Sequence, residues 1–521
     1  MDVTHQVVIV GAGPAGMVTA LLLGDLGVDC LVVDKRTQIS PLPRARGIHA
    51  RASEILRQLR VEQDMTAAAL RVRPQMEIRG PLDQPPAATI PTGGADFAEV
   101  SACEGIAIAQ DLFESVLRDH LAHRPSVELR LGLRATDLEI LTDGTAVVGL
   151  ADTVNGENVC RVHATYIVAA DGWRSEIRSL CKIDFHGAES LAALRSVLFR
   201  ADLAPWLGDP PPAFVQLTHV PGILLPTHAD NRWATMRFDG PTGAGPGDVA
   251  RFIQEQFGID VTAEPIGDTR WSVGVQWASS MQHGPVLLAG DAAHRVTPQG
   301  AGGISMAMAD AHNLTWKLAA ILDGWGGPGL LPSYDAERGP VSRDICRANQ
   351  AMWTSMAESG SSAAPTDLRM LDMGYRYASD LIIGRDDGPV LDAAATYTPS
   401  ANPGARAPHA WLDDDRRQST LDAYGRGFVL VCRRRSTWPQ IVVRYQDPGT
   451  VPVAALDTER ADVVAAYGLD RGGHVDGAVL VRPDGHIAWR TNGEANPESA
   501  LHQALANASG NTPPAPHNWW R

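Results

Sequence analysis

A glycine-rich turn between a buried strand and a helix lies almost at the start of this chain and constrains its fold most strongly. The run Val7–Val10 is apolar, Gly11-x-Gly13-x-x-Gly16 follows it, and residues 14–26 carry small and apolar side chains at helical spacing. Gly27 ends that helix and Cys30–Val33 forms the next strand. This order predicts a parallel α/β sheet that binds a dinucleotide at the turn.

Each glycine of this turn has its own expected task. Gly11 permits the tight turn, Gly13 lets the backbone approach a pyrophosphate, and Gly16 lets the helix pack closely on the strand, so that the helix N-terminus faces the phosphate charge. An acidic residue at the end of the second strand can accept hydrogen bonds from ribose hydroxyls. The residues expected to bind the dinucleotide here are Gly11, Gly13, Pro14, Ala15, Gly16, Asp34, Lys35 and Arg36. These features alone fit either FAD or NAD.

Two later motifs also place an aspartate at the end of an apolar strand. Asp171-Gly172 follows Tyr166–Ala170, and Gly290-Asp291 follows Val286–Ala289 and precedes a glycine-rich loop. Ligands collect at the carboxyl ends of strands in α/β sheets. An aspartate there can also simply cap the next helix. The sequence leaves both interpretations open for each motif taken alone.

Together, the three motifs in this order resemble the FAD-dependent aromatic hydroxylases, the family of para-hydroxybenzoate hydroxylase, over roughly residues 5–345. The long members that modify aromatic polyketides are the most similar in pattern. The resemblance implies an α/β protein with a Rossmann-like FAD-binding fold, an inserted β-rich substrate domain and a C-terminal thioredoxin-like domain. It also implies FAD as the bound cofactor, NADPH or NADH as reductant, and O2.

The resemblance assigns further FAD contacts by motif. Arg44 in Pro43-Arg44-Ala45 resembles the family's arginine loop over the cofactor, and Gln110 matches the glutamine that reaches the ribityl chain. Asp291 matches the aspartate that binds a ribityl hydroxyl. Asp171 lies in a segment that is linked in the family to both FAD and NAD(P)H. The segment Tyr334–Pro340 resembles the family's closing signature.

The loop from Pro298 to Ser305 is expected to lie beside the reactive part of the flavin. We expect a helix to begin at Met306, so that the backbone of Gly303, Ile304 and Ser305 can stabilise negative charge at flavin N1 and O2. Pro298 is expected near the reacting centre. Relatives usually carry Asn at the position of Ser305, which puts a side-chain contact there in doubt. No side chain is assigned as the catalytic base.

The resemblance, together with a small and polar stretch near 397–406, divides the chain into three expected domains. The FAD-binding domain takes 1–70, 101–180 and 278–397, the substrate-binding β-sheet domain takes 71–100 and 181–277, and the thioredoxin-like domain takes 404–521. A helix is expected over Met370–Ile383, and strands over Phe428–Cys432, Gln440–Arg444 and Ala478–Arg482. The C-terminal part has Cys432 but no Cys-x-x-Cys pair, so no redox role is expected for it.

The activity implied by the resemblance is hydroxylation of a polycyclic phenol or quinone of polyketide type, through a C4a-hydroperoxyflavin. A Baeyer–Villiger or ring-rearranging oxygenase would use the same fold, and the motifs do not separate the two. A non-catalytic FAD-binding partner protein and a plain NAD-dependent dehydrogenase are the remaining possibilities. The polar and aromatic side chains of the presumed substrate domain are expected mainly to pack the sheet or lie on the surface: Arg195, His219, His228, Arg232, Arg237, Trp233, Trp271 and Trp277.

The composition of the chain limits the classes of molecule that it is expected to bind. The net charge is −15 and the isoelectric point is about 5.5, which disfavours nucleic acid and anionic membrane as partners. Six scattered cysteines argue against a zinc site or a disulfide framework, and no metal site is expected. No leader or membrane span is expected, so the expected location is the cytoplasm. We expect a monomer or homodimer.

Overall fold

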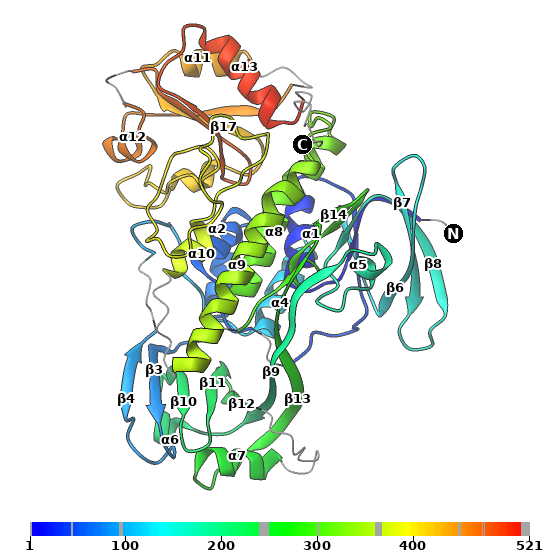
Figure 1. Ribbon diagram of the computed structural model, residues 1–521, viewed down its shortest axis with the longest axis vertical. Coiled ribbons are helices and arrows are strands. Elements are labelled where there is room, and N and C mark those ends of the chain that lie inside the picture. Colours follow the sequence, from blue (N-terminus) through cyan, green and yellow to red (C-terminus); the bar gives the residue numbers. More distant parts are fainter. Residues whose placement is uncertain are drawn as a thin grey trace.

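Three β-sheets follow one another along the long axis of the molecule in the computed structural model (Figure 1). The C-terminal sheet lies at one end, the second sheet at the other, and the first sheet between them. The structure describes residues 3–42, 45–92, 97–238, 249–298, 300, 302–359, 367–445, 450–470, 473 and 475–511. Within them, no helix is long and apolar enough to cross a membrane.

The first sheet contains the glycine-rich turn. Its strand order is β14-β15-β8-β1-β2-β5, and β6 and β7 extend it in antiparallel fashion from β8. Its central strands are parallel and almost fully buried, which is why they are continuous apolar runs rather than alternating ones. The strands are β1 (Val3–Val10), β2 (Cys30–Asp34), β5 (Val127–Leu131), β6 (Leu133–Ile140), β7 (Ala146–Asp152), β8 (Asn158–Ala169), β14 (Gln282–His283) and β15 (Val286–Leu288).

Helices α1 (Pro14–Asp25), α4 (Gln110–Leu121) and α8 (Gly302–Leu322) contribute apolar side chains to the same core as this sheet. Helix α1 has Pro14 in its first turn, where a missing N–H costs nothing, and it ends before Gly27, whose φ is +76°. The short helices α2 (Ala50–Gln58), α3 (Glu62–Ala67) and α5 (Glu176–Leu180) border it. The predicted parallel α/β fold is therefore confirmed.

The second sheet has the order β16-β13-β9-β12-β11-β10-β3-β4 and is antiparallel except between β3 and β10. Helix α7 (Val249–Phe257) packs on one face, where Phe252 and Phe257 meet Phe199 and Val197. The expected β-rich insertion is confirmed. Its strands are β3 (Arg73–Arg79), β4 (Ala88–Pro91), β9 (Phe185–Arg200), β10 (Pro212–Leu217), β11 (Gly222–His228), β12 (Arg232–Phe238), β13 (Glu264–Ala278) and β16 (His294–Arg295).

The C-terminal sheet has the order β18-β17-β19-β20, with β17 parallel to β18 and antiparallel to β19. This β-α-β-α-β-β-α arrangement is thioredoxin-like, as expected. Its elements are β17 (Phe428–Arg433), α11 (Trp438–Val443), β18 (Val453–Thr458), α12 (Ala461–Tyr467), β19 (Ala478–Val481), β20 (Ile487–Thr491) and α13 (Pro497–Ala508).

Two predicted elements were wrong. The segment Gln440–Arg444 belongs to helix α11 rather than to a strand, because Trp438, Ile441 and Val442 bury one helical face while Val443 is 67% exposed. The helix expected over Met370–Ile383 is only α10 (Leu368–Met373), which ends at Gly374. The remaining residues of the expected helix, 374–383, are not helical.

A buried ion network joins the C-terminal part to the first sheet's helices. Arg482 donates to both oxygens of Glu337 in α9 (Pro332–Ser359), at 2.6 and 2.8 Å, and Lys317 of α8 donates to the same carboxylate at 2.8 Å. Arg406 pairs with Glu54 of α2. All five side chains are at most 2% exposed, so this contact is part of the core. The domain boundaries expected from the sequence stay a prediction.

Candidate active site

The three sequence motifs meet at one edge of the first sheet. Strands β2, β1, β8 and β15 are neighbours in register, so their carboxyl ends lie side by side. A Cβ atom on Gly11 would lie 2.2 Å from the carbonyl oxygen of Ala170, next to Asp171. A Cβ atom on Gly290 would lie 2.8 Å from Cβ of Ala15. Segments about 160 and 280 residues apart thus form one site at the carboxyl edge.

The glycine turn has the shape that a pyrophosphate requires. Gly11 has φ +109°, and a Cβ atom on Gly16 would lie 1.8 Å from the Gly11 carbonyl oxygen, so these two glycines are required by the fold itself. A Cβ atom on Gly13 would meet nothing within 4 Å. The open side of Gly13 lies at the N-terminus of α1, where backbone N–H groups attract phosphate. These residues fit the phosphates of a dinucleotide.

Asp34 lies at the end of β2 with its carboxylate fixed by the backbone. Oδ2 accepts the Ala12 N–H at 2.8 Å and Oδ1 accepts the Arg36 N–H at 2.7 Å. Each oxygen keeps a further lone pair for a ribose hydroxyl. Lys35 is exposed beside it. Arg44, predicted to cover the cofactor, lies outside the described residues.

Asp171 caps the next helix, one of the two roles that the sequence left open, and its role toward a cofactor stays a prediction. Its Oδ2 caps helix α5 by accepting the N–H groups of Glu176 at 2.8 Å and Ile177 at 3.3 Å. Its Oδ1 is buried and has no hydrogen-bond partner among the described residues. Burial raises the pKa of this carboxyl group. An unsatisfied buried oxygen at the edge of a proposed cofactor site fits a hydroxyl donor from that cofactor.

A buried aspartate that sequence reasoning missed holds the Gly290-Asp291 motif. Asp310 of α8 accepts the Gly290 N–H at 2.9 Å and a bond from His294 at 2.6 Å through Oδ2, and its Oδ1 accepts from Arg338 at 2.8 Å. Burial opposes the charge of Asp310, but His294 and Arg338 lower the pKa of its carboxyl group. Asp291 itself is exposed. The sequence signal that could have revealed Asp310 is that it is the single carboxylate in the largely apolar segment that forms α8.

Helix α8 begins earlier than expected, at Gly302 instead of Met306. Gly303, Ile304 and Ser305 therefore form its first turn rather than a preceding loop, although glycine is a weak helix former. A Cβ atom on Gly302 would meet nothing within 4 Å, so the helix start has open space beside it. Pro298, just before it, is exposed. The N–H groups of this long helix's first turn can stabilise an anion, as expected of this segment.

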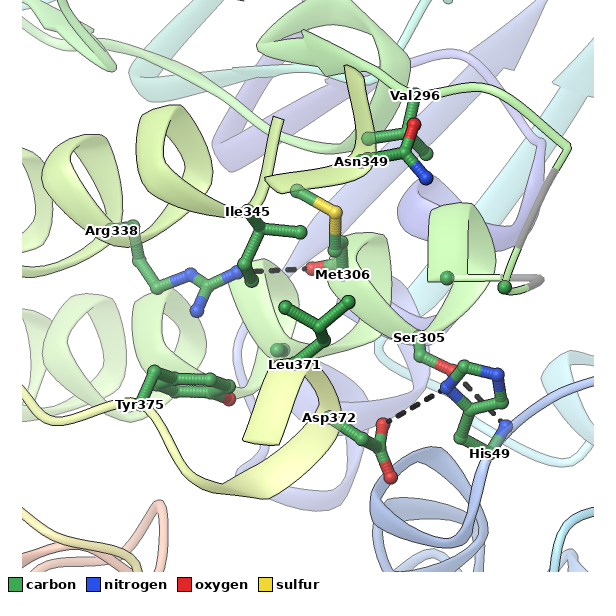
Figure 2. Close-up of a pocket in the computed structure, with 13 residues that line it drawn as sticks. His49, Val296, Ser305, Met306, Arg338, Ile345, Asn349, Leu371, Asp372 and Tyr375 are labelled. Atoms are coloured by element: carbon green, nitrogen blue, oxygen red, sulfur yellow. Dashed lines mark hydrogen bonds and ion pairs between the residues drawn. The ribbon is translucent and has the colours of Figure 1, made fainter. Parts of the chain in front are cut away.

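A small pocket adjoins this first turn on the side of α9 and α10. Figure 2 shows Ser305 of α8 beside His49 and Asp372, while the Met306 side chain points toward Ile345 and Asn349 of α9. The Ser305 hydroxyl accepts the His49 backbone N–H at 3.1 Å, and the His49 imidazole lies 3.5 Å from Asp372 Oδ1 (Figure 2). The Ser305 side chain therefore contacts another residue of the protein, and a contact with the flavin stays untested.

Gln110 begins helix α4 as predicted, and its backbone N–H donates to the Ala45 carbonyl at 3.1 Å. Its side-chain amide donates to Glu114 at 2.6 Å, which fixes it at the helix start. The structure therefore brings Gln110 to the segment that follows the arginine loop. The role expected of Gln110 toward a ribityl chain stays a prediction.

The second sheet turns an apolar face toward this fold. Leu198, Leu225 and Ala234 are buried there, with partly exposed Phe214, Met236 and Ile266 around them. The guanidinium of Arg46 lies over the Phe214 ring at 4.6 Å and donates to the Pro226 carbonyl at 3.1 Å. This face and Arg46 could border a flat aromatic molecule.

Most polar residues suspected in the substrate domain have structural partners. Arg195 is paired with Asp268 at 2.7 Å, Arg232 with Asp111 at 2.7 Å, and Trp233 lies in the core beneath α7. Trp271 donates to the Ser196 hydroxyl at 2.8 Å. These contacts agree with the packing roles expected of them, and the absence of a substrate role stays a prediction.

Comparison with known proteins gives a consistent result. The family described as "FAD binding domain" matches residues 4–349, and "Aromatic-ring hydroxylase, C-terminal" matches residues 400–512. A tetracenomycin B2 monooxygenase-dioxygenase of Streptomyces olivaceus is 32% identical, covering 96% of this chain and 98% of the relative. An aklavinone 12-hydroxylase of Streptomyces purpurascens is 30% identical, covering 94% and 95%.

Solved structures agree over the whole length. The ternary complex of aklavinone-11 hydroxylase with FAD and aklavinone superposes with a TM-score of 0.86 at 28% identity, covering 98% of this chain and 99% of that one. The flavin-dependent monooxygenase PieE, in complex with FAD and substrate, superposes with a TM-score of 0.87 at 26% identity and the same coverage.

Proposed function

This chain belongs to the FAD-dependent aromatic-ring hydroxylases, and from that premise we propose that it hydroxylates a polycyclic, polyketide-like phenol or quinone with NAD(P)H as reductant and O2 as oxygen source. The observation that carries this proposal is the convergence of the three motifs at one sheet edge, beside the open start of α8. Relatives over the full length that are named for polycyclic substrates support the substrate class.

The proposed FAD site uses the residues of that edge. In this proposal Gly13 and the first turn of α1 bind the pyrophosphate, and Asp34 binds the ribose. Asp171, through Oδ1, and Asp291 accept hydrogen bonds from other polar groups of the cofactor. Bound FAD supplies electron transfer from the nicotinamide and activation of O2. The N–H groups of Gly303, Ile304 and Ser305 would stabilise negative charge on the flavin, and Asp310 fixes the Gly290-Asp291 motif by accepting the Gly290 N–H.

The substrate is proposed to lie between this edge and the apolar face of the second sheet. Residues 71–100 and 181–277 would supply that face, as the sequence predicts. Phe214 and Met236 offer flat contact area, and Arg46 offers a fixed positive charge that favours a phenolate over a phenol. A dry apolar surface also keeps water from the activated oxygen.

The test uses the purified full chain with bound FAD. NADPH or NADH oxidation is followed under ¹⁸O₂, with and without a panel of polycyclic phenols, and the products are analysed by mass. We expect substrate to stimulate the oxidation and one labelled oxygen to be retained on an aromatic ring. A labelled lactone or ring-opened acid would contradict hydroxylation and support the Baeyer–Villiger alternative. FAD that stays oxidised with both reductants and every phenol would contradict the enzymatic proposal.

A further inference from the structure

His49 connects the start of α8 to two other parts of the molecule. It directly precedes α2, and its backbone N–H donates to the Ser305 hydroxyl in the first turn of α8. Its imidazole Nδ1 lies 3.5 Å from Asp372 Oδ1 in α10, and the backbone of Gly300 also favours the protonated ring by raising its pKa. Figure 2 shows the imidazole turned toward Asp372 beside the helix start. One residue therefore fixes both sides of the turn proposed to face the flavin.

The surroundings of the imidazole favour its charged form. A neutral imidazole has one N–H and one lone pair, so it cannot offer donors on both nitrogens. Burial lowers the pKa of His49, but the hydrogen bond and charge of Asp372 and the Gly300 backbone together raise it above the ordinary value. Asp372 is 1% exposed, so its charge is poorly screened.

Other charged groups near His49 are engaged elsewhere. Arg338 of α9 lines the same pocket but directs its Nε to Asp310. Arg51, two residues along, directs its guanidinium to Glu54. Tyr375 completes this side of the pocket, and the facing turn of α8 contributes the neutral side chains of Ser305 and Met306. Asp372 is therefore the acidic group that faces the imidazole among the described residues that line the pocket.

We propose that His49 is a cationic positioning residue of the flavin site: held by Asp372 and Gly300, it fixes the first turn of α8 and favours the reduced, more negative flavin over the oxidised one. This inference rests on the proposed FAD site. A positive charge behind the N-terminus of α8 acts in the same direction as the helix dipole. Its influence is greater for the form of the flavin that carries negative charge.

The experiment compares the reduction potential of bound FAD in the wild type with that in His49→Gln and Asp372→Asn, by spectroelectrochemistry from pH 6 to 9. In His49→Gln we expect about tenfold weaker binding of reduced relative to oxidised FAD at pH 7, which is a fall of about 30 mV for a two-electron couple. The wild-type potential should approach that of His49→Gln at high pH, where the imidazole is neutral. Asp372→Asn should move this change to lower pH.

His120→Gln is the matched control, because His120 of α4 pairs with Asp64 of α3 at 2.8 Å in an exposed contact, and neither residue lines this pocket. It should leave the potential unchanged. Equal potentials in wild type and His49→Gln, with FAD bound to both, would overturn the inference and leave the proposed function standing. A folded His49→Gln protein whose affinities for oxidised and for reduced FAD fall by the same factor would also overturn the inference. A wild-type chain that takes up no FAD would instead contradict the proposed function itself.

Discussion

Arg482, in the turn between β19 and β20, donates two hydrogen bonds to Glu337 in the N-terminal part of α9, and neither side chain has any exposed surface. Arg482 also pairs with buried Asp484, so its removal leaves Asp484 without its guanidinium partner and Glu337 with Lys317 as its remaining ion-pair partner. We expect Arg482→Met to lower the free energy of unfolding of the full chain by about 3 to 5 kcal/mol, measured by urea denaturation.

An exposed pair in the same part of the chain provides the control for this prediction. Arg444 lies 2.9 Å from Glu498, and both side chains are more than half exposed. Arg444→Met should change the free energy of unfolding by less than about 1 kcal/mol. Equal effects of the two substitutions would contradict the view that the C-terminal part is locked to α9 by buried charge.

Gly11 and Gly13 should respond differently to alanine. At Gly13 the added Cβ atom meets no protein atom, so Gly13→Ala should fold normally but bind FAD about tenfold more weakly or worse, because the methyl group occupies the phosphate side of the turn. Isothermal titration with FAD measures this. Gly11→Ala should instead destabilise the apoprotein by more than about 1 kcal/mol, because of its φ of +109° and the contact with Ala170. Unchanged FAD affinity in Gly13→Ala would place the pyrophosphate elsewhere.

Two buried histidines should make the protein sensitive to mild acid. Burial lowers the pKa of His312 to about 3 and of His486 to about 4, from an ordinary value of 6.5. Below pH 6.5 the unfolded chain binds a proton at each histidine and the folded chain does not. Stability should thus be complete above pH 6.5 and fall by about 1.4 kcal/mol per pH unit for each histidine until the folded pKa is reached.

Urea denaturation midpoints at pH 8, 6 and 5 measure this loss. His312→Gln should reduce the slope, because it removes one of the two titrating groups while Gln can still accept from Arg51 or donate to Gln58. A midpoint that is the same at pH 8 and pH 5 would show that these imidazoles are not buried in their neutral form.

The thiols should differ in reactivity. Burial raises the pKa of Cys181 to about 11 and those of Cys346 and Cys432 to about 12, whereas Cys160 is partly exposed. Because the thiolate is the reactive form, a disulfide reagent at pH 7.5 should label Cys160 in the native protein and all six cysteines after denaturation. Rapid labelling of Cys432 would contradict the expectation that the thioredoxin-like part has no redox role.

Features set by local sequence were predictable. The Gly11 turn lies between strand and helix as its spacing requires. The strand ends at Asp171 and Gly290 could be predicted because apolar runs precede them. Neighbouring strand ends in a parallel sheet then bring these motifs together.

Features set by distant contacts were not predictable. Asp310 lies 20 residues from Gly290, and Glu54 lies 352 residues from its partner Arg406, so no local pattern indicates either pairing. Helix α8 begins four residues earlier than expected, and Ser305 in its first turn accepts a hydrogen bond from His49, 256 residues away. The β-branched residues around Val443 favour a strand. The burial of one helical face decides the structure instead, and the segment forms α11.

The buried position of Arg482 also has a consequence for synthesis on the ribosome. Glu337 emerges 145 residues before Arg482, a delay of about 7 to 30 s at about 5 to 20 residues per second. During that time the Glu337 carboxylate lacks its guanidinium partner, and Lys317 of α8 is the cation already available to it. The ion network between α8, α9 and the last hairpin is therefore complete only after that hairpin is made, so the segment that completes the cofactor half of the molecule is translated long after that half itself.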